Sequence, residues 1–398
     1  MRVTYAFVSL LLLDAIFLVL ASSSLSIGKH EAEIFFEGSG YLKAILDLSV
    51  TLLGQNDFAL RAPFILLHLV NTILLYQVSR EVVRRPEDLL LVAMLFLMLP
   101  GVNTAALIVS KTGVIIFLTL TFVRLFQLYG KHAYYLLIPM AFVDNAFLYL
   151  FVSLMFFGHY RKESRMLFFS ILAFSISYYF YGFDLGEEAR GYFLDIFSIY
   201  AAIFSPFVFI FFIYALYWQF VKANTRLPVM WFIAAVAFLI SIILSLRQNI
   251  RIEDFAPYAV IFVPYMVFTF YNSYRIRLPE FRKVHKVVFA TVMVTLVLNT
   301  VTTFFNKPLY LLMSNPKRHF AYEHHFTKDL AAQLKSMGIK AVECDSATMQ
   351  KKLRFYGIDE SPEYRLEKAM PLGVEFEKIS FTIFGQEIEY FFIYKAES

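Results

Sequence analysis

The sequence contains little charge and almost no cysteine. Only 17% of its 398 residues are charged, and it has 1 cysteine and 2 tryptophans, whereas soluble domains carry about 25% charged residues. The lone Cys344 excludes an internal disulfide framework and any metal site built from several cysteines. Walker, G-x-G-x-x-G and G-x-S-x-G motifs are also missing from the sequence. Nothing in it therefore favours nucleotide-driven transport or hydrolase chemistry.

What the sequence has instead is apolar residues in long blocks. Hydrophobic residues make up 59% of the chain, and the mean hydropathy is +0.62. The blocks have the length of helices that cross a hydrocarbon layer about 30 Å thick. They are apolar throughout rather than alternating, which excludes a lipid-facing β-barrel. The predicted spans are 4–27, 60–79, 89–108, 113–129, 166–182, 197–217, 229–246, 255–270 and 288–304.

A further apolar stretch, 133–158, is divided by Asp144-Asn145 into halves too short to cross the membrane comfortably. Basic loop residues gather on the cytoplasmic side of membrane proteins. The basic loops of this sequence can all lie on the cytoplasmic side only if 133–158 is a helical hairpin that enters the membrane and exits it on that same side. This predicts about eleven passes, with the N-terminus cytoplasmic and the C-terminus outside. The basic residues are Arg80, Arg84, Arg85, Lys131, Arg161, Lys162, Arg165, Lys222, Arg226, Arg275, Arg277, Arg282, Lys283 and Lys286.

The N-terminal stretch also has some features of a signal peptide. Asp14 within the apolar run, and the lack of a clear A-x-A cleavage site, favour an uncleaved first helix instead. The first outer loop, 28–59, then mixes apolar and charged residues at helical spacing between Lys29 and Asp47. This pattern is typical of an amphipathic helix lying in the membrane interface.

From Lys307 onward the composition becomes that of a soluble domain. We therefore predict a transmembrane domain, 1–306, followed by a small α/β domain, 307–398. Its expected elements are a helix ending near Gly338, a strand in IKAVECD, a helix in TMQKKLRFYG and a hairpin turning at Gly385-Gln386. Adjacent His324 and His325 lack the spacing of zinc ligands, so we interpret them as solvated side chains.

Four charged residues of the outer face are candidates for chemistry. Glu31 and Glu33 could act as general bases for an acceptor hydroxyl, although outer loops are often acidic without any function. Arg61 opens the second span, and Lys111 lies in the turn between the third and fourth spans. Either could bind a lipid phosphate, or could instead anchor the helix end at the interface.

The stretch LLGQNDFALRAPFILLHLVNTILLYQVSREV, 52–82, carries an F-A-x-R-x-P motif and a long helix ending in Tyr and Arg. It resembles the lipid-linked-sugar glycosyltransferases of the GT-C fold, in particular the bacterial aminoarabinose transferase and protein O-mannosyltransferase group. HEAEIFFEGSGYLKAI is similar to the first outer loop of that group, and RIEDFAPYAVIFVPYMV to its late R-x-x-Y-x-x-P-x-x-P segment. The resemblance covers most of the membrane part.

This resemblance implies an inverting enzyme that moves a sugar from a polyprenyl-phosphate donor to an acceptor on the outer face. Glu31 would be the base, supported by Glu33 and His30, while Lys111 and its partners would hold the donor phosphate. The phosphate-binding set consists of Arg61, Lys111 and Arg190. His30 stands where the family usually has Asp, and Lys111 where relatives often have an acid. No cofactor is implied; a divalent metal remains open, and no metal ligands are indicated.

Two other functions remain open. The missing acids are also compatible with a catalytically inactive binder or flippase-like protein for lipid-linked sugars. A secondary transporter would usually show internal repeats, and none is visible. In each case the expected location is the bacterial inner membrane, with the C-terminal domain in the periplasm. The expected partners are membrane lipids, the polyprenyl-phosphate sugar and an outer-face acceptor of lipid, glycan or protein, and not nucleic acid.

Overall fold

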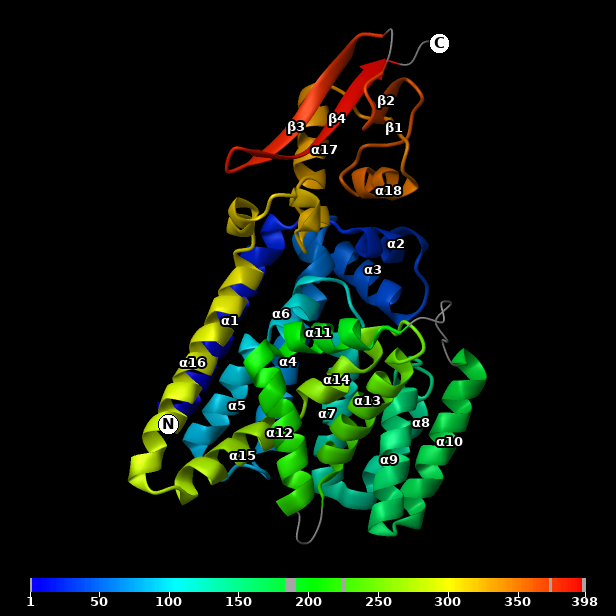
Figure 1. Ribbon diagram of the computed structural model, residues 1–398. Helices are drawn as coiled ribbons and strands as arrows, with labels where there is room; N and C mark the ends of the chain where they lie inside the picture. Colours follow the sequence, from blue (N-terminus) through cyan, green and yellow to red (C-terminus); the bar gives the residue numbers. More distant parts are fainter. Residues whose placement is uncertain (1, 183–190, 223–226, 372–373, 396–398) are drawn as a thin grey trace. The chain divides into compact units, whose positions relative to one another are not determined.

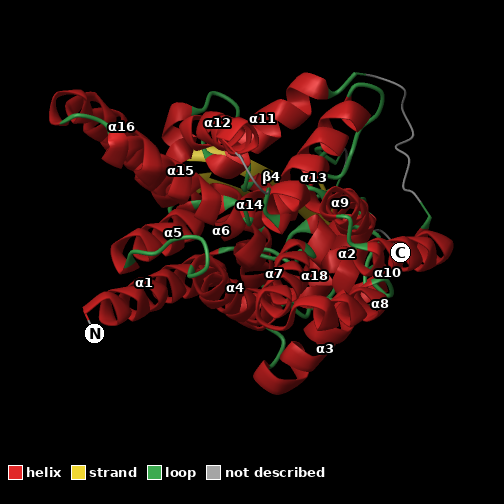
Figure 2. Cartoon of the chain, turned by 90° about the horizontal axis from the view of Figure 1, so that it is seen from below, coloured by secondary structure: helices red, strands yellow, loops and turns green. Residues whose placement is uncertain are grey.

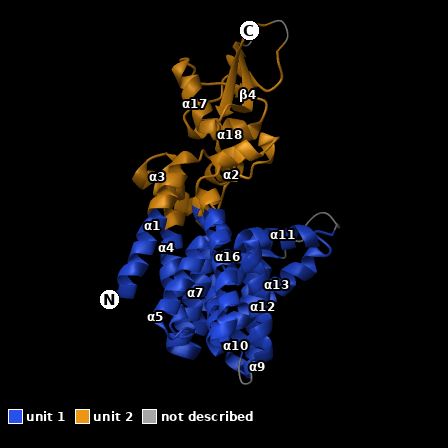
Figure 3. Cartoon of the chain, turned by 60° about the vertical axis from the view of Figure 1, so that its left-hand side comes forward, with its two compact units in different colours: residues 1–15, 66–106, 110–300 blue, residues 16–65, 107–109, 301–398 orange. Residues whose placement is uncertain are grey.

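The computed structural model describes residues 2–182, 191–222, 227–371 and 374–395 (Figure 1). The chain forms two compact units (Figure 3). Unit 1 comprises residues 1–15, 66–106 and 110–300, and unit 2 comprises residues 16–65, 107–109 and 301–398. Unit 2 thus combines the C-terminal region with the first outer loop.

The named elements among the described residues of unit 1 are all helices, and Figure 2 shows these helices in red. Four helices, α1, α4, α6 and α16, continue from one unit into the other, α6 by its last residue alone. The helices that contribute to unit 1 are α1 (Arg2–Ser24), α4 (Asp57–Ser79), α5 (Pro86–Met98), α6 (Pro100–Leu107), α7 (Thr112–Tyr129), η1 (Gly130–Leu136), α8 (Leu137–Met140), α9 (Phe147–Arg161), α10 (Ser164–Tyr181), α11 (Phe193–Phe204), α12 (Pro206–Lys222), α13 (Val229–Ser245), η2 (Ile252–Asp254), α14 (Ala256–Val260), α15 (Val263–Ile276) and α16 (Pro279–Phe304).

Four helical segments of the described chain are long and apolar enough to cross a membrane. They are α1, α4, α16 and the run Thr112–Met140, and two bent helix pairs would raise the number to six. Large apolar side chains along α1 and α16 are exposed, among them Leu12 at 60% and Val288 at 56%. Such faces are suited to lipid contact. The predicted eleven passes stay a prediction.

Two of the predicted spans are bent rather than straight. The pair α5 and α6 bends by 57°, at Pro100, which lacks the backbone N–H that a continuous helix requires. The pair α11 and α12 bends by 102°. Ser205 joins them with a φ of 72°, next to Pro206. The predicted span over 197–217 is therefore not one straight helix, because Ser205, with its positive φ, ends α11 and redirects the chain.

The predicted break at Asp144-Asn145 is confirmed. Residues 141–146 form turns between α8 and α9. Lys111, which immediately precedes α7, donates to Asp144 Oδ1 at 3.1 Å. Asp144 therefore lies close to the beginning of α7, which means that the chain reverses its direction between α7 and Asp144. α9 has 15 residues, or about 22 Å at 1.5 Å per residue, which is shorter than a hydrocarbon core of about 30 Å.

Unit 2 contains a four-stranded sheet in the order β1-β2-β4-β3. β1 and β2 are parallel, while β4 pairs antiparallel with both β2 and β3. The further elements of this unit are α2 (Lys29–Glu37), α3 (Tyr41–Leu53), η3 (Lys307–Leu312), η4 (Pro316–Arg318), η5 (Tyr322–His324), α17 (Thr327–Ser336), β1 (Glu343–Cys344), α18 (Ala347–Phe355), β2 (Tyr364–Glu367), β3 (Phe376–Ile383) and β4 (Gln386–Lys395).

Most of the predicted elements of unit 2 are present. The expected interfacial helix forms two helices, α2 and α3, because Gly40 adopts a φ of 81° between them. The hairpin turns at Phe384-Gly385, one residue earlier than predicted, and both turn residues have positive φ. This is the backbone conformation of a tight two-residue hairpin turn. β2 was not predicted.

Within unit 2, the C-terminal region packs on the first outer loop. Phe355 at the end of α18 lies in an apolar cluster with Ile27, Leu46 and Leu60. The adjacent Tyr356 donates its hydroxyl to Asp57 Oδ1 at 2.5 Å. The same hydroxyl accepts the Ile27 N–H at 2.8 Å. One phenol thus links three separate parts of the chain.

Replacing Tyr356 by Phe should destabilise unit 2. The change leaves the Ile27 N–H and one Asp57 oxygen without this partner, at a cost of about 1–3 kcal/mol. Thermal unfolding of the detergent-solubilised protein should show a lowered midpoint. Tyr364→Phe is the matched control, since no hydrogen bond of the Tyr364 hydroxyl is found in the described chain. Equal midpoints for the two variants would contradict this role of Tyr356.

Candidate functional site

The most buried charged group of unit 2 is Arg61, whose side chain has no exposed surface. A guanidinium carries five N–H donors, and here every one has a partner. Nε and one terminal nitrogen donate to the carboxylate of Glu31, at 3.3 and 2.8 Å. The remaining three donors reach the backbone carbonyls of Ser22, Leu25 and Ser26 at 3.0, 2.6 and 2.9 Å. Phosphate binding by Arg61 would require some of these bonds to break.

Glu31 occupies the third position of α2, and its side chain is 3% exposed. Besides Arg61, its oxygens accept the N–H of Gly28 at 2.8 Å and of Val109 at 3.2 Å. Burial alone would raise the pKa of Glu31, but the charge of Arg61, the charge that His324 carries when protonated and the Gly28 N–H outweigh it and lower the pKa. Glu31 is therefore ionised at neutral pH, and its four hydrogen bonds fix its position.

His324 joins this pair from the C-terminal region. Its Nδ1 lies 2.9 Å from the carbonyl oxygen of Ser26 and 3.8 Å from Glu31 Oε2. The Ser26 N–H donates in return to the His324 carbonyl at 2.7 Å. His325, its neighbour, is buried between Tyr310 and Asn306 at 2.8 Å from each. The interpretation of both histidines as solvated was wrong, because the side chain of His324 is only 19% exposed and His325 is buried.

The other two residues predicted beside Glu31 lie differently. His30 is exposed on α2, and Glu33 is half-buried on the same helix. In the described part of the chain, neither side chain makes a hydrogen bond or ion pair. The structure therefore groups Glu31 with Arg61 and His324, rather than with His30 and Glu33.

Lys111 belongs to a separate cluster, in unit 1. Its Nζ donates to Asp144 Oδ1 at 3.1 Å and to Asn145 Oδ1 at 3.3 Å, and forms an ion pair with Asp254. The side chain of Lys111 is 12% exposed and that of Asp254 6%. Burial raises the pKa of Asp254, although the Lys111 charge opposes the shift. Arg190, the last predicted phosphate ligand, lies outside the described residues.

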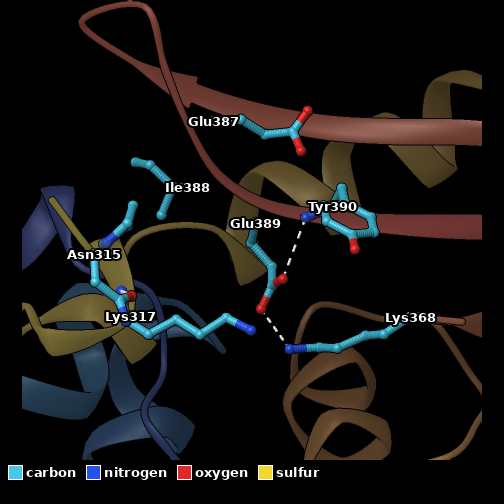
Figure 4. Close-up of a pocket in the computed structure, with 8 residues that line it drawn as sticks. Asn315, Lys317, Lys368, Glu387, Ile388, Glu389 and Tyr390 are labelled. Carbon is cyan, nitrogen blue, oxygen red and sulfur yellow. Dashed lines mark hydrogen bonds and ion pairs between the residues drawn. The ribbon is translucent and has the colours of Figure 1, made fainter.

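A cavity of about 250 Å³ lies elsewhere in unit 2 (Figure 4). Lys317 and Lys368 point towards Glu389, and Lys368 forms an ion pair with it. Tyr322 donates its hydroxyl to the same carboxylate. The cavity therefore contains charges of both signs. Among the described residues, no group of three or more His, Cys, Asp or Glu could hold a metal ion.

Comparison with known proteins gives a match in structure and none in sequence. No protein-family model matches the chain, and no curated protein matches it. A crystal structure of ArnT from Cupriavidus metallidurans in the apo state matches 98% of this chain and 97% of its own, with a TM-score of 0.57 and 12% identity. The same protein bound to undecaprenyl phosphate matches over the same shares, with a TM-score of 0.56 and 10% identity.

The chain has the GT-C fold. This confirms the fold implied by the resemblance of 52–82, and it makes the chain a multi-pass helical membrane protein. Since the identities are 12% and 10%, the likeness establishes the GT-C architecture alone.

Glu31→Gln should destabilise the protein strongly, because it leaves the buried Arg61 charge uncompensated. Breaking one partner of a buried ion pair costs about 3–5 kcal/mol. Glu37 is the matched control: it lies on the same helix and pairs with Lys351, but its side chain is 63% exposed. Glu37→Gln should cost about 0–1 kcal/mol.

The pH dependence gives an independent check. Because folding lowers the pKa of Glu31, its contribution is present above the unfolded pKa and is lost as pH falls through the folded pKa. Thermal unfolding from pH 7 to pH 3 should therefore show a smaller acid-dependent loss in Glu31→Gln than in the unmodified protein. Identical pH curves would mean that Glu31 is not held as its contacts indicate.

Proposed function

We propose that this protein is a membrane glycosyltransferase that uses a polyprenyl-phosphate sugar. The observation that carries the proposal is the full-length likeness to ArnT, which has been solved with undecaprenyl phosphate bound. The chain's own residues add two charged clusters, Glu31 with Arg61 and His324, and Lys111 with its carboxylates. A transferase of this kind needs a cation for the donor phosphate and a group that accepts the acceptor proton.

In the proposed reaction, an acceptor hydroxyl attacks the anomeric carbon of the donor sugar. The bond from this carbon to the phosphate oxygen breaks, and the phosphate leaves with the bonding electrons. Attack from the opposite side inverts the anomeric centre. The acceptor is a lipid, glycan or protein on the non-cytoplasmic face of a bacterial inner membrane, with the N-terminus cytoplasmic and the C-terminal region outside.

Lys111 is the cation that we assign to the donor phosphate. Asp144, Asn145 and Asp254 hold its ammonium group in place. A phosphate oxygen would take the place of one of these oxygens on the ammonium group. Arg61 holds the first outer loop instead, because its side chain has no exposed surface, whereas that of Lys111 is 12% exposed. We keep the proposal that proton transfer from the acceptor takes place near Glu31, His30 and Glu33.

A second candidate is a protein that binds lipid-linked sugars without transferring them. It is favoured by one observation: the acid of the first outer loop, Glu31, is already paired with Arg61. His30 also occupies the position where relatives usually have Asp. The two candidates differ in whether product is formed, and agree on donor binding.

Purified protein in nanodiscs should bind undecaprenyl phosphate, and Lys111→Ala should weaken that binding at least tenfold, or about 1.4 kcal/mol. Lys131→Ala, which changes an exposed lysine on η1, is the matched control and should bind normally. With a radiolabelled pool of polyprenyl-phosphate sugars and an envelope extract, label should move to the acceptor fraction. Binding without transfer would favour the second candidate, and no binding would contradict both.

A further inference from the structure

We propose that the Nε2 atom of His324 accepts the acceptor proton, with Glu31 as the positioning residue beside it. The inference rests on the proposed function and names the catalytic base for it. Resemblance to the family pointed to the acids of the first outer loop. The structure instead brings a histidine from the C-terminal region to that loop.

The hydrogen bond at Nδ1 fixes which nitrogen is basic. A backbone carbonyl oxygen can accept but cannot donate, and the Ser26 carbonyl lies 2.9 Å from Nδ1. Nδ1 therefore carries the hydrogen, and Nε2 has the free lone pair of a neutral imidazole. The return bond from the Ser26 N–H to the His324 carbonyl holds the two segments together at 2.7 Å.

Nε2 is also available. In the described part of the chain it makes no hydrogen bond, and the His324 side chain retains 19% of its exposure. The ring lies against Gly28, where a Cβ atom would come within 2.4 Å of Cε1 and 3.0 Å of Nε2. The His324 ring can therefore lie next to the first outer loop because Gly28 has no side chain.

Glu31 is poorly placed to take the proton itself. Oε1 accepts from Arg61 Nε and the Val109 N–H, and Oε2 accepts from Arg61 and the Gly28 N–H. A proton arriving at either oxygen would break one of these bonds and leave the Arg61 charge unbalanced. The same fixed negative charge, 3.8 Å from Nδ1, instead stabilises an imidazolium that forms on His324.

The charged groups around His324 keep it neutral before reaction. Burial lowers the pKa of His324, Glu31 raises it, and Arg61 and Lys352 lower it further, while the Ser26 carbonyl opposes them. His325 is also neutral, because burial lowers its pKa to about 3. A lowered pKa means that His324 is unprotonated at pH 7, which is the state that a general base needs.

As a lone pair of the acceptor oxygen forms the new bond to the anomeric carbon, the hydroxyl proton moves to the lone pair of Nε2, and the O–H electrons stay on the oxygen. The bond to the donor phosphate breaks and its electrons leave with the phosphate. The imidazolium then gives its proton to water, and the enzyme is restored.

The test is His324→Asn in the labelled-donor assay. An asparagine amide can still donate to the Ser26 carbonyl, but it cannot accept a proton at neutral pH. The turnover rate should fall by about 10²–10⁴-fold, with undecaprenyl phosphate binding unchanged within about twofold. The acidic limb of the pH–rate profile should disappear. His132→Asn, at an exposed histidine of η1, should leave rate and profile as in the unmodified protein.

Each outcome has one meaning. Product from the unmodified protein and undiminished turnover in His324→Asn would overturn the base but keep the glycosyltransferase. Loss of donor binding or of folding in His324→Asn would assign His324 a structural role and overturn the inference. No product from the unmodified protein would overturn the proposed function. In that case ¹⁵N NMR of labelled histidine still tests the site, because His324 protonated at Nε2 rather than Nδ1 would contradict the assigned tautomer.

Discussion

The buried ion pair of Arg61 and Glu31 is the constraint on which the rest of unit 2 depends. A guanidinium without exposed surface is tolerable only when its charge and all five N–H donors are matched. Here a carboxylate and three carbonyls provide the match, and they come from the end of α1, the segment after it and α2. Satisfying one arginine therefore fixes the course of the first outer loop.

The position of His324 follows from that arrangement. Once Arg61 holds the Ser26 carbonyl and Glu31, His324 can approach both, provided that residue 28 has no side chain. Lys328 donates its backbone N–H to the Ser26 hydroxyl at 3.1 Å, which extends the same contact by a few residues. The outer loop and the C-terminal region thus form one site within unit 2.

Much of the fold could be predicted from local patterns. Apolar blocks marked the helices, Asp144-Asn145 marked a reversal, and the F-A-x-R-x-P stretch pointed to the GT-C fold. The bend at Ser205 was missed because apolar residues continue on both sides of it, although Pro206 is a signal for a helix boundary. β2 was missed because a four-residue strand has too little alternation to distinguish it from a loop.

The assignment of Glu31, Arg61 and Lys111 to a functional site stays a prediction. Glu31, Arg61 and Lys111 were recognised as candidate charges, but their partners were not, because the partners lie far away in the sequence and follow no fixed spacing. His324 was missed for the same reason: adjacent histidines suggested only zinc, and the spacing argued against it. Gly28 is a signal in retrospect, since it directly precedes α2 where a polar capping residue is the commoner choice.

The measurement that tests this account most directly is a double-mutant cycle of Glu31→Gln and Arg61→Met, read by thermal unfolding in detergent. If Glu31 and Arg61 stabilise each other as described, the double variant should lose much less stability than the sum of the losses in the two single variants. The expected coupling energy is at least about 2 kcal/mol, within the range seen for groups in one ion-pair network. Additive effects within about 0.5 kcal/mol would contradict the account, because they would mean that Glu31 and Arg61 do not hold each other.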